Sequence, residues 1–299
     1  MSPSLTAPAT IAATALLAAG GGAQPAAAPT PVGAMVVWNS GQNGASKTFS
    51  SGGVTVTLSV HHGAQGEMAP TIRAEAGGQA LSLVGDPSEL PAAANAGVGR
   101  LDASAEGLQV LFSDYTGGAH CCDHVRVLER LRGAWRVVDV AKVEGGPLEA
   151  FPADLDGDGV ADIVLPDDRF AYAFTYYAAS HMPPRIYNLA NGVVVDVSAS
   201  PKYAQVFRQD MARAAEGCRQ HGNGACAAYV ADAARVGEFA RAWRVMLASY
   251  DKTARWDWPR ECLVHAPPGR CPKSKQRTFP NMPDALKAFL IRLGYIRAG

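Results

Sequence analysis

The feature that most limits how this chain can fold is a crowded run of carboxylates joined directly to an apolar run. Four aspartates share one short stretch, at Asp154, Asp156, Asp158 and Asp162. Carboxylates this close repel one another unless a cation lies among them, and Ca²⁺ takes about six to eight oxygen ligands. Gly159 permits the sharp turn that returns the Val160 carbonyl and Asp162 to the ion. The pattern predicts a calcium loop.

The residues after the aspartates separate this loop from an EF-hand. An EF-hand ends with a bidentate glutamate, but that position is Leu165 here, and the residues 163–165 predict a buried strand. The loop resembles the calcium loop of FG-GAP and VCBS-type repeats, in which D-x-D-x-D-G-x-x-D leads straight into a strand. That resemblance implies side-chain ligation by the four aspartates and a carbonyl ligand from Val160. The alternative is an acidic surface turn that holds no ion.

A second resemblance covers about residues 107–200, a third of the chain. Its motifs are the stretch Tyr115–Cys122, the aromatic stretch 168–174 and the segments 183–186 and 191–198. They resemble a group of uncharacterised secreted bacterial proteins. The resemblance implies a fold and calcium binding, and it implies no activity.

Charge is balanced over the whole chain but divided along it. The 299 residues contain 27 Lys and Arg and 27 Asp and Glu, so no overall basic charge points to nucleic acid. Residues 143–168 contain eight acidic residues and no basic one, whereas residues 252–297 contain ten basic and three acidic ones. Either the two segments complement each other, or the basic one meets an anionic cell-surface polymer or an envelope protein.

The N-terminal residues 1–33 have the composition of a secretory signal. They are mostly Ala, Gly, Pro, Ser and Thr, with a modest apolar centre over residues 11–19 and small residues suited to cleavage after it. The usual positive charge is missing, since no Lys or Arg precedes Lys47, so a disordered lead is the alternative. No apolar run is long enough to predict a membrane span. We expect a secreted or periplasmic protein.

Six cysteines form three close pairs, and local pairing is the simplest arrangement. These pairs are Cys121 with Cys122, Cys218 with Cys226, and Cys262 with Cys271. Disulfides persist in oxidising compartments, which agrees with export. The adjacent Cys121 and Cys122 either bridge each other or reach elsewhere in the chain.

Hydrophobic periodicity changes near residue 200. Residues 34–200 contain short runs rich in β-branched residues, which predict a mainly antiparallel β domain, either a sandwich or a partial propeller-like assembly. Residues 201–299 predict a helical region stapled by disulfides, with helices to about residue 217, over 225–251 and from 283 to 294. The expected fold class is α+β.

The other cluster of ligand-type side chains is His120, Cys122 and His124. In an extended chain these three share a face, which suits zinc or copper, whereas a disulfide at this place removes the thiolate ligand. No G-x-S-x-G, H-E-x-x-H or phosphate-loop signature is present.

Three function classes therefore remain. The leading one is a secreted, calcium-stabilised binding or structural module of the cell envelope without enzymatic activity. The alternatives are an envelope hydrolase with a structural calcium site and a metal or redox protein built on the His120–His124 cluster.

Overall fold

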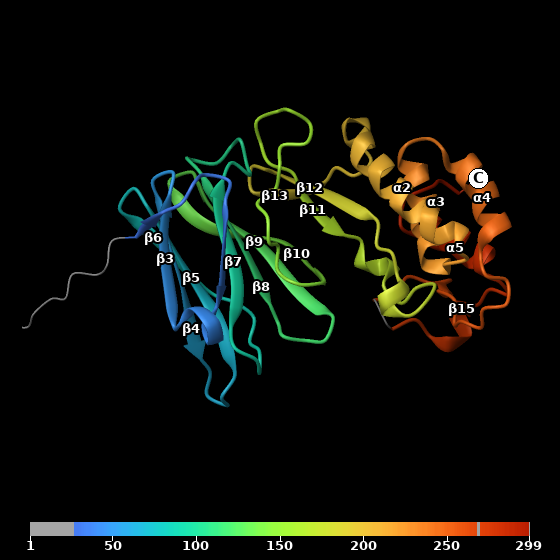
Figure 1. The fold of residues 1–299 in the computed structure, drawn as a ribbon, viewed down its shortest axis with the longest axis horizontal. Helices are drawn as coiled ribbons and strands as arrows, with labels where there is room; N and C mark the ends of the chain where they lie inside the picture. The colour runs from blue at the N-terminus through green and yellow to red at the C-terminus, as the bar shows by residue number, and fades with distance from the viewer. Residues whose placement is uncertain (1–26, 268–269, 299) are drawn as a thin grey trace, which may run out of the picture.

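The computed structural model describes residues 27–267 and 270–298, in which a β part and a helical part lie side by side (Figure 1). The predicted leader lies outside the described residues except for its end. There, β1 (Ala28–Pro29) pairs in parallel with its neighbour in the sheet, β3 (Ser46–Ser51). No helix of the described chain is long and apolar enough to cross a membrane.

The β part is a sandwich of two five-stranded sheets. The first sheet has the order β1-β3-β4-β5-β6, with β3 (Ser46–Ser51), β4 (Val54–His62), β5 (Met68–Ala76) and β6 (Gln79–Val84). The second has the order β10-β9-β8-β7-β2, with β2 (Met35–Asn39), β7 (Ala93–Gly99), β8 (Gln109–Tyr115), β9 (Cys121–Leu131) and β10 (Ala134–Glu144). The short helix α1 (Ser40–Asn43) comes directly after β2.

Alternation along each strand builds the core between these sheets. Val54, Val56 and Leu58 of β4 point inward and are almost fully buried, whereas the threonines between them are only partly covered. Strand β8 is buried on both faces, because Phe112 joins the core of the sandwich and Leu111 joins a second core. Such a strand reads as a continuous apolar run in the sequence.

A third, smaller sheet covers the outer face of the second sheet. It contains β11 (Ile163–Pro166), β12 (Pro184–Ala190) and β13 (Val193–Asp196) in the order β11-β12-β13. Ile163 and Leu165 pack against Leu111 and Val127 there. The run after the aspartates is therefore a buried strand, as predicted, and the acidic loop is held at its N-terminal end.

The helical region contains α2 (Ala204–Arg219), α3 (Asn223–Arg235), α4 (Phe239–Ser249) and α5 (Met282–Arg292). A two-stranded ribbon of β14 (Glu261–Cys262) and β15 (Gln276–Arg277) lies in the long connection before α5. Cys218 of α2 is bonded to Cys226 of α3, and both are fully buried. The expected fold class, antiparallel β with a disulfide-stapled helical C-terminal region, is confirmed.

One predicted element is wrong. The single helix expected over residues 225–251 is two helices, α3 and α4, separated by a turn at Gly237. Gly237 has φ of 78°, a left-handed conformation that ends helices and that glycine adopts without steric cost. The apolar stripe continues across the break because both helices pack on the same core.

Candidate functional site

The acidic loop brings three carboxylates together. Ligand atoms of Asp154, Asp156 and Asp162 all lie within 4.8 Å of one another. Positive φ angles at Gly157 (79°) and Gly159 (85°) allow the chain to turn this tightly. In the part of the chain that the structure describes, this is the one place where three or more such side chains converge.

Backbone donors fix the loop around its first aspartate. The Asp154 carboxylate accepts hydrogen bonds from the N–H groups of Gly157 (2.7 Å) and Gly159 (2.9 Å), and Asp162 accepts one from Leu155 N–H (2.7 Å). The Asp162 N–H closes the loop by donating to the Ala153 carbonyl at 2.8 Å. These bonds position the Asp154 and Asp162 carboxylates from within the loop.

Asp158, the fourth predicted aspartate ligand, is placed differently. The Asp158 carboxylate lies outside the group of three and accepts the Val160 N–H at 2.8 Å. The described geometry thus gathers three of the four predicted aspartate ligands, and the carbonyl ligand expected from Val160 stays a prediction.

The start of the helical region contacts this loop. Tyr203, at the end of a short 3₁₀ turn over Pro201–Tyr203, donates its phenol O–H to Asp162 Oδ1 at 2.7 Å. Lys202 Nζ lies 2.9 Å from Asp156 Oδ2. The Lys202 hydrogen bond lowers the pKa of Asp156, and burial, reinforced by the bond to Asp162, raises the pKa of Tyr203. One ammonium group therefore already neutralises part of the acidic cluster.

The donor set of this loop fits a hard cation. All its converging groups are carboxylate oxygens, and oxygen ligands in a flexible arrangement suit Ca²⁺, whereas thiolate and imidazole ligands suit zinc and copper. Asp154, Asp156 and Asp162 would hold the ion, and the single charge of Lys202 leaves the cluster negative.

The His120, Cys122 and His124 cluster is not brought together. Cys121 and Cys122 are bonded to each other, so neither offers a thiolate. The His120 ring stacks on Tyr177 with centroids 3.9 Å apart. His124 lies between two carboxylates, with Nδ1 3.2 Å from Asp86 and Nε2 2.9 Å from Asp139.

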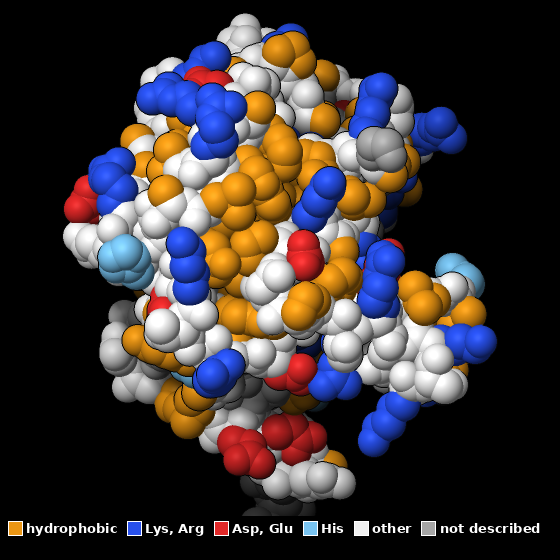
Figure 2. Space-filling view, turned by 90° about the vertical axis from the view of Figure 1, so that its right-hand side faces the viewer, with side chains coloured by type: hydrophobic (Ala, Val, Ile, Leu, Met, Phe, Trp, Pro, Cys, Tyr) orange, Lys and Arg blue, Asp and Glu red, His pale blue; other side chains and the backbone are white. Residues whose placement is uncertain are grey.

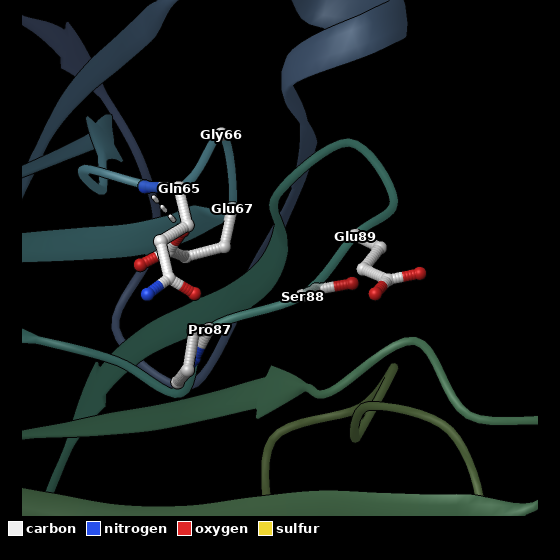
Figure 3. Close-up of a pocket in the computed structure, with 6 residues that line it drawn as sticks. All are labelled: Gln65, Gly66, Glu67, Pro87, Ser88 and Glu89. Carbon is white, nitrogen blue, oxygen red and sulfur yellow. Dashed lines mark hydrogen bonds between the residues drawn. The ribbon is translucent and has the colours of Figure 1, made fainter.

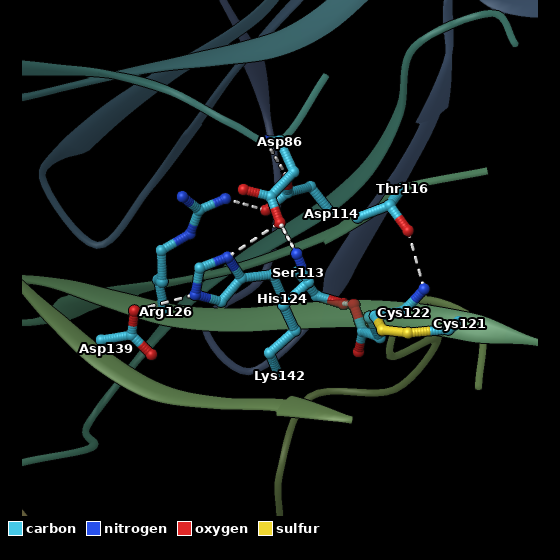
Figure 4. Close-up of polar contacts among 11 residues, drawn as sticks. Asp86, Ser113, Asp114, Thr116, Cys121, Cys122, His124, Arg126, Asp139 and Lys142 are labelled. Carbon is cyan, nitrogen blue, oxygen red and sulfur yellow. Dashed lines mark hydrogen bonds and ion pairs between the residues drawn. A yellow bond between two sulfur atoms is a disulfide. The ribbon is translucent and has the colours of Figure 1, made fainter. Parts of the chain in front are cut away.

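Around His124 the structure shows a polar network that the sequence did not indicate (Figure 4). The buried Asp114 carboxylate pairs with the Arg126 guanidinium and also accepts the Asp86 N–H at 2.7 Å. Asp86 in turn pairs with Lys142 at 2.7 Å. Asp114 and Asp86 each have a cation of the protein itself, so the network ties the loop after β6 to the second sheet.

The same network contains a buried carboxyl group with an altered pKa. Asp123 is 1% exposed, and burial raises its pKa to about 7. Ser113 Oγ donates to Asp123 Oδ1 at 2.6 Å and accepts the Leu148 N–H at 2.8 Å. Nothing in the sequence marked Asp123 as a buried carboxyl group, because its strand β9 also carries the charged residues Arg126, Glu129 and Arg130.

A shallow pocket of about 500 Å³ lies at the edge of the first sheet (Figure 3). Its two carboxylates, Glu67 and Glu89, do not converge, because Glu89 points away from the side of the pocket that holds Glu67. Glu67 Oε2 accepts the Gln65 N–H at 3.0 Å within its own turn. The geometry here gives no acid and base pair.

Comparison with known proteins finds a family model that matches the helical region. The model of the sll0997 C-terminal domain matches residues 202–294. The probable thylakoid lumen protein sll0997 of Synechocystis sp. (strain ATCC 27184 / PCC 6803 / Kazusa) is 38% identical over 197 residues, which cover 63% of this chain and 57% of that protein. The uncharacterized protein y4bJ of Sinorhizobium fredii (strain NBRC 101917 / NGR234) is 28% identical over 201 residues, or 66% of this chain and 31% of that protein. No solved structure matches.

These findings correct the resemblance to FG-GAP and VCBS repeats, which is wrong. The matched family lies over residues 202–294, outside the loop that carried the resemblance, and neither relative is named for such a repeat. A motif of about a dozen residues was too short to identify a family, because any chain that gathers carboxylates at a tight turn needs the same aspartates and glycines. The chain spans only part of its curated relatives, and its residues 202–294 are similar to the sll0997 C-terminal domain.

Proposed function

We propose that this protein is a binding or structural module, without enzymatic activity, of an extracytoplasmic compartment such as the cell envelope or a lumen. Its acidic loop binds Ca²⁺ and braces the β part against the helical region. Two observations support the compartment: a relative is named as a probable thylakoid lumen protein, and all six cysteines are paired. Disulfides persist in oxidising compartments.

The observation that carries the proposal is the meeting of Asp154, Asp156 and Asp162 within 4.8 Å, beside Tyr203 of the helical region. An ion among these carboxylates would hold β11 and the turn before α2 at one point. Because the carboxylates are gathered only in the folded chain, the ion binds the folded state and stabilises it. The gain is about 2.7 kcal/mol when the free ion exceeds its Kd a hundredfold.

Melting temperatures in EDTA and in millimolar CaCl₂ test the calcium site. We expect calcium to raise the melting temperature of the wild type by about 5 °C or more, and to leave that of Asp156→Ala unchanged. Glu149→Ala is the matched control, since Glu149 is exposed and lies outside the loop. An unchanged wild-type melting temperature at saturating calcium, with no ion bound in native mass spectrometry, would end the proposal.

The basic segment, residues 252–297, provides the surface through which the module binds a partner. Its ion pairs among the described residues are local, Arg260 with Asp257 and Arg277 with Glu261, and none reaches residues 143–168. Lys273 and Lys275 are exposed. Figure 2 shows Lys and Arg side chains spread around an apolar surface on this end of the molecule. We propose that an anionic polymer of the envelope is the partner, because exposed like charges attract such a chain.

A further inference from the structure

A cleft of about 1020 Å³ lies in the helical region, away from the acidic loop. It opens between α5 and the connection that the Cys262–Cys271 disulfide closes, and its apolar lining includes Trp258, Val264, Phe289 and Leu293. Binding sites for small molecules are concave, mostly apolar and about 300–1,000 Å³ in volume, with a few polar groups that orient the ligand. The cleft has the volume and the mostly apolar lining of such a site.

Three guanidinium groups line the cleft, and two of them are already paired. Arg169 makes a two-point contact with the buried Asp167, with Nε 2.6 Å from Oδ1. Arg260 pairs with Asp257 at 2.9 Å. Both charges are therefore compensated by the protein, and neither requires a ligand.

Arg292 is different. Its one hydrogen bond to a described residue is from Nη1 to the Arg260 carbonyl at 2.7 Å, and none of the described carboxylates lies within ion-pair distance of it. The guanidinium also lies over the Phe289 ring, 5.2 Å from the centroid, which fixes its plane. Arg292 is exposed, and the partial desolvation of its guanidinium lowers its pKa; nearby Glu261 opposes this, and the Arg169 cation adds to it.

A guanidinium offers five N–H donors in a fixed plane, and the one hydrogen bond that Arg292 makes to a described residue leaves donors for an anion. We propose that this cleft binds a small organic anion, whose carboxylate or phosphate pairs with Arg292 and whose apolar body lies against Trp258 and Phe289. Arginine binds both anions through two parallel hydrogen bonds, and aromatic walls favour a flat apolar ligand. None of the residues that carry this site belongs to the acidic loop, so the two proposals stand or fall separately.

Isothermal titration calorimetry of the full chain tests the site with three probes of one shape. These are 2-naphthoate, 2-naphthyl phosphate and the uncharged 2-naphthamide. We expect at least one of the two anions to bind at one site per chain, and the amide to bind at least tenfold more weakly, because it cannot form the charge-assisted pair. Failure of both anions to bind at millimolar concentration would overturn the proposal, as would equal binding of the amide.

Substitutions in the cleft test whether the anion binds there. Arg292→Gln is expected to weaken anion binding by about tenfold or more, since a hydrogen bond to a charged group is lost. Arg244→Gln, which removes an exposed charge of α4 outside the cleft lining, is the matched control and should change binding less than twofold. If Arg292→Gln does not fold, Val264→Glu replaces it as the test. Val264 is 41% exposed, and a carboxylate at this position should weaken anion binding because it repels the ligand. Unchanged anion binding in the folded variant would refute the site.

Discussion

The phenol of Tyr203 and the carboxylate of Asp162 share a hydrogen bond of 2.7 Å across the junction between the β part and the helical region. Both residues are almost fully buried, at 2% and 1% exposure. Asp162 ends the acidic loop and Tyr203 precedes α2, so one bond links the candidate ion site to the helices. The contribution of this contact to stability can therefore be measured by substituting Tyr203 alone.

Tyr203→Phe should lower the free energy of unfolding by about 1–3 kcal/mol in EDTA, because a buried carboxylate oxygen loses its donor. Urea denaturation measures the change. Tyr187→Phe is the control, since Tyr187 is also buried but its hydroxyl makes no hydrogen bond with a described residue. Equal effects of the two substitutions would show that the Asp162 contact contributes nothing particular.

Lys202→Met should raise the affinity of the loop for Ca²⁺ several-fold. The Lys202 ammonium lies 2.9 Å from Asp156 Oδ2, so an incoming cation meets a like charge that the variant removes. Calcium titration followed by melting temperature or calorimetry measures the affinity. Lys287→Met, at an exposed position of α5, should leave it unchanged. A weaker affinity in Lys202→Met would contradict the expectation.

Asp123 should make the protein less stable as pH rises from about 4 to 7. Burial raises its pKa in the folded state to about 7, so in this window the folded chain keeps a proton that the unfolded chain has lost. A one-unit difference in pKa corresponds to about 1.4 kcal/mol. Below this window both states are protonated, and above it the loss is complete.

Asp123→Asn isolates that contribution, because asparagine resembles the protonated carboxyl group and still accepts from Ser113. Urea denaturation at pH 4.5 and pH 8 should show the variant gaining stability relative to the wild type at the higher pH. Parallel stability curves for the two proteins between these pH values would contradict a raised Asp123 pKa.

The two disulfides of the helical region should differ in accessibility. Cys218 and Cys226 are both fully buried, whereas Cys262 and Cys271 are partly exposed. Limited treatment with dithiothreitol under native conditions, followed by alkylation and peptide mapping, should label Cys262 and Cys271 first. Labelling of Cys218 and Cys226 first, or free thiols before any reduction, would contradict the structure.

Lys273→Glu combined with Lys275→Glu should weaken retention of the protein on an anionic cell-wall fraction and make that retention less dependent on salt. Both side chains are exposed, so the melting temperature should stay within about 1 °C of the wild type. A lower melting temperature with unchanged retention would instead indicate that these lysines dock within the molecule. Absence of wild-type retention at low salt would remove the polymer as a partner.

Local sequence patterns predicted much of the fold. The strand after Asp162 forms as expected, and its side chains Ile163 and Leu165 are buried because apolar groups on one face of a strand pack away from water. The helix expected from 283 to 294 is α5, with Asn281 as its N-cap accepting the Asp284 N–H at 2.9 Å. The break between α3 and α4 escaped prediction, because the apolar stripe runs on through Gly237 while its backbone conformation ends the helix.

The sequence by itself determined the local features: the tight acidic turn, the close cysteine pairs and the change from strands to helices near residue 200. Each depends on residues that are neighbours in the chain. Tertiary structure alone decided that Tyr203 reaches Asp162, that His124 lies between Asp86 and Asp139, and that Arg292 lines its cleft with none of the described carboxylates at ion-pair distance. These relationships join residues far apart in sequence, and only the packing of the sheets and helices determines which side chains meet.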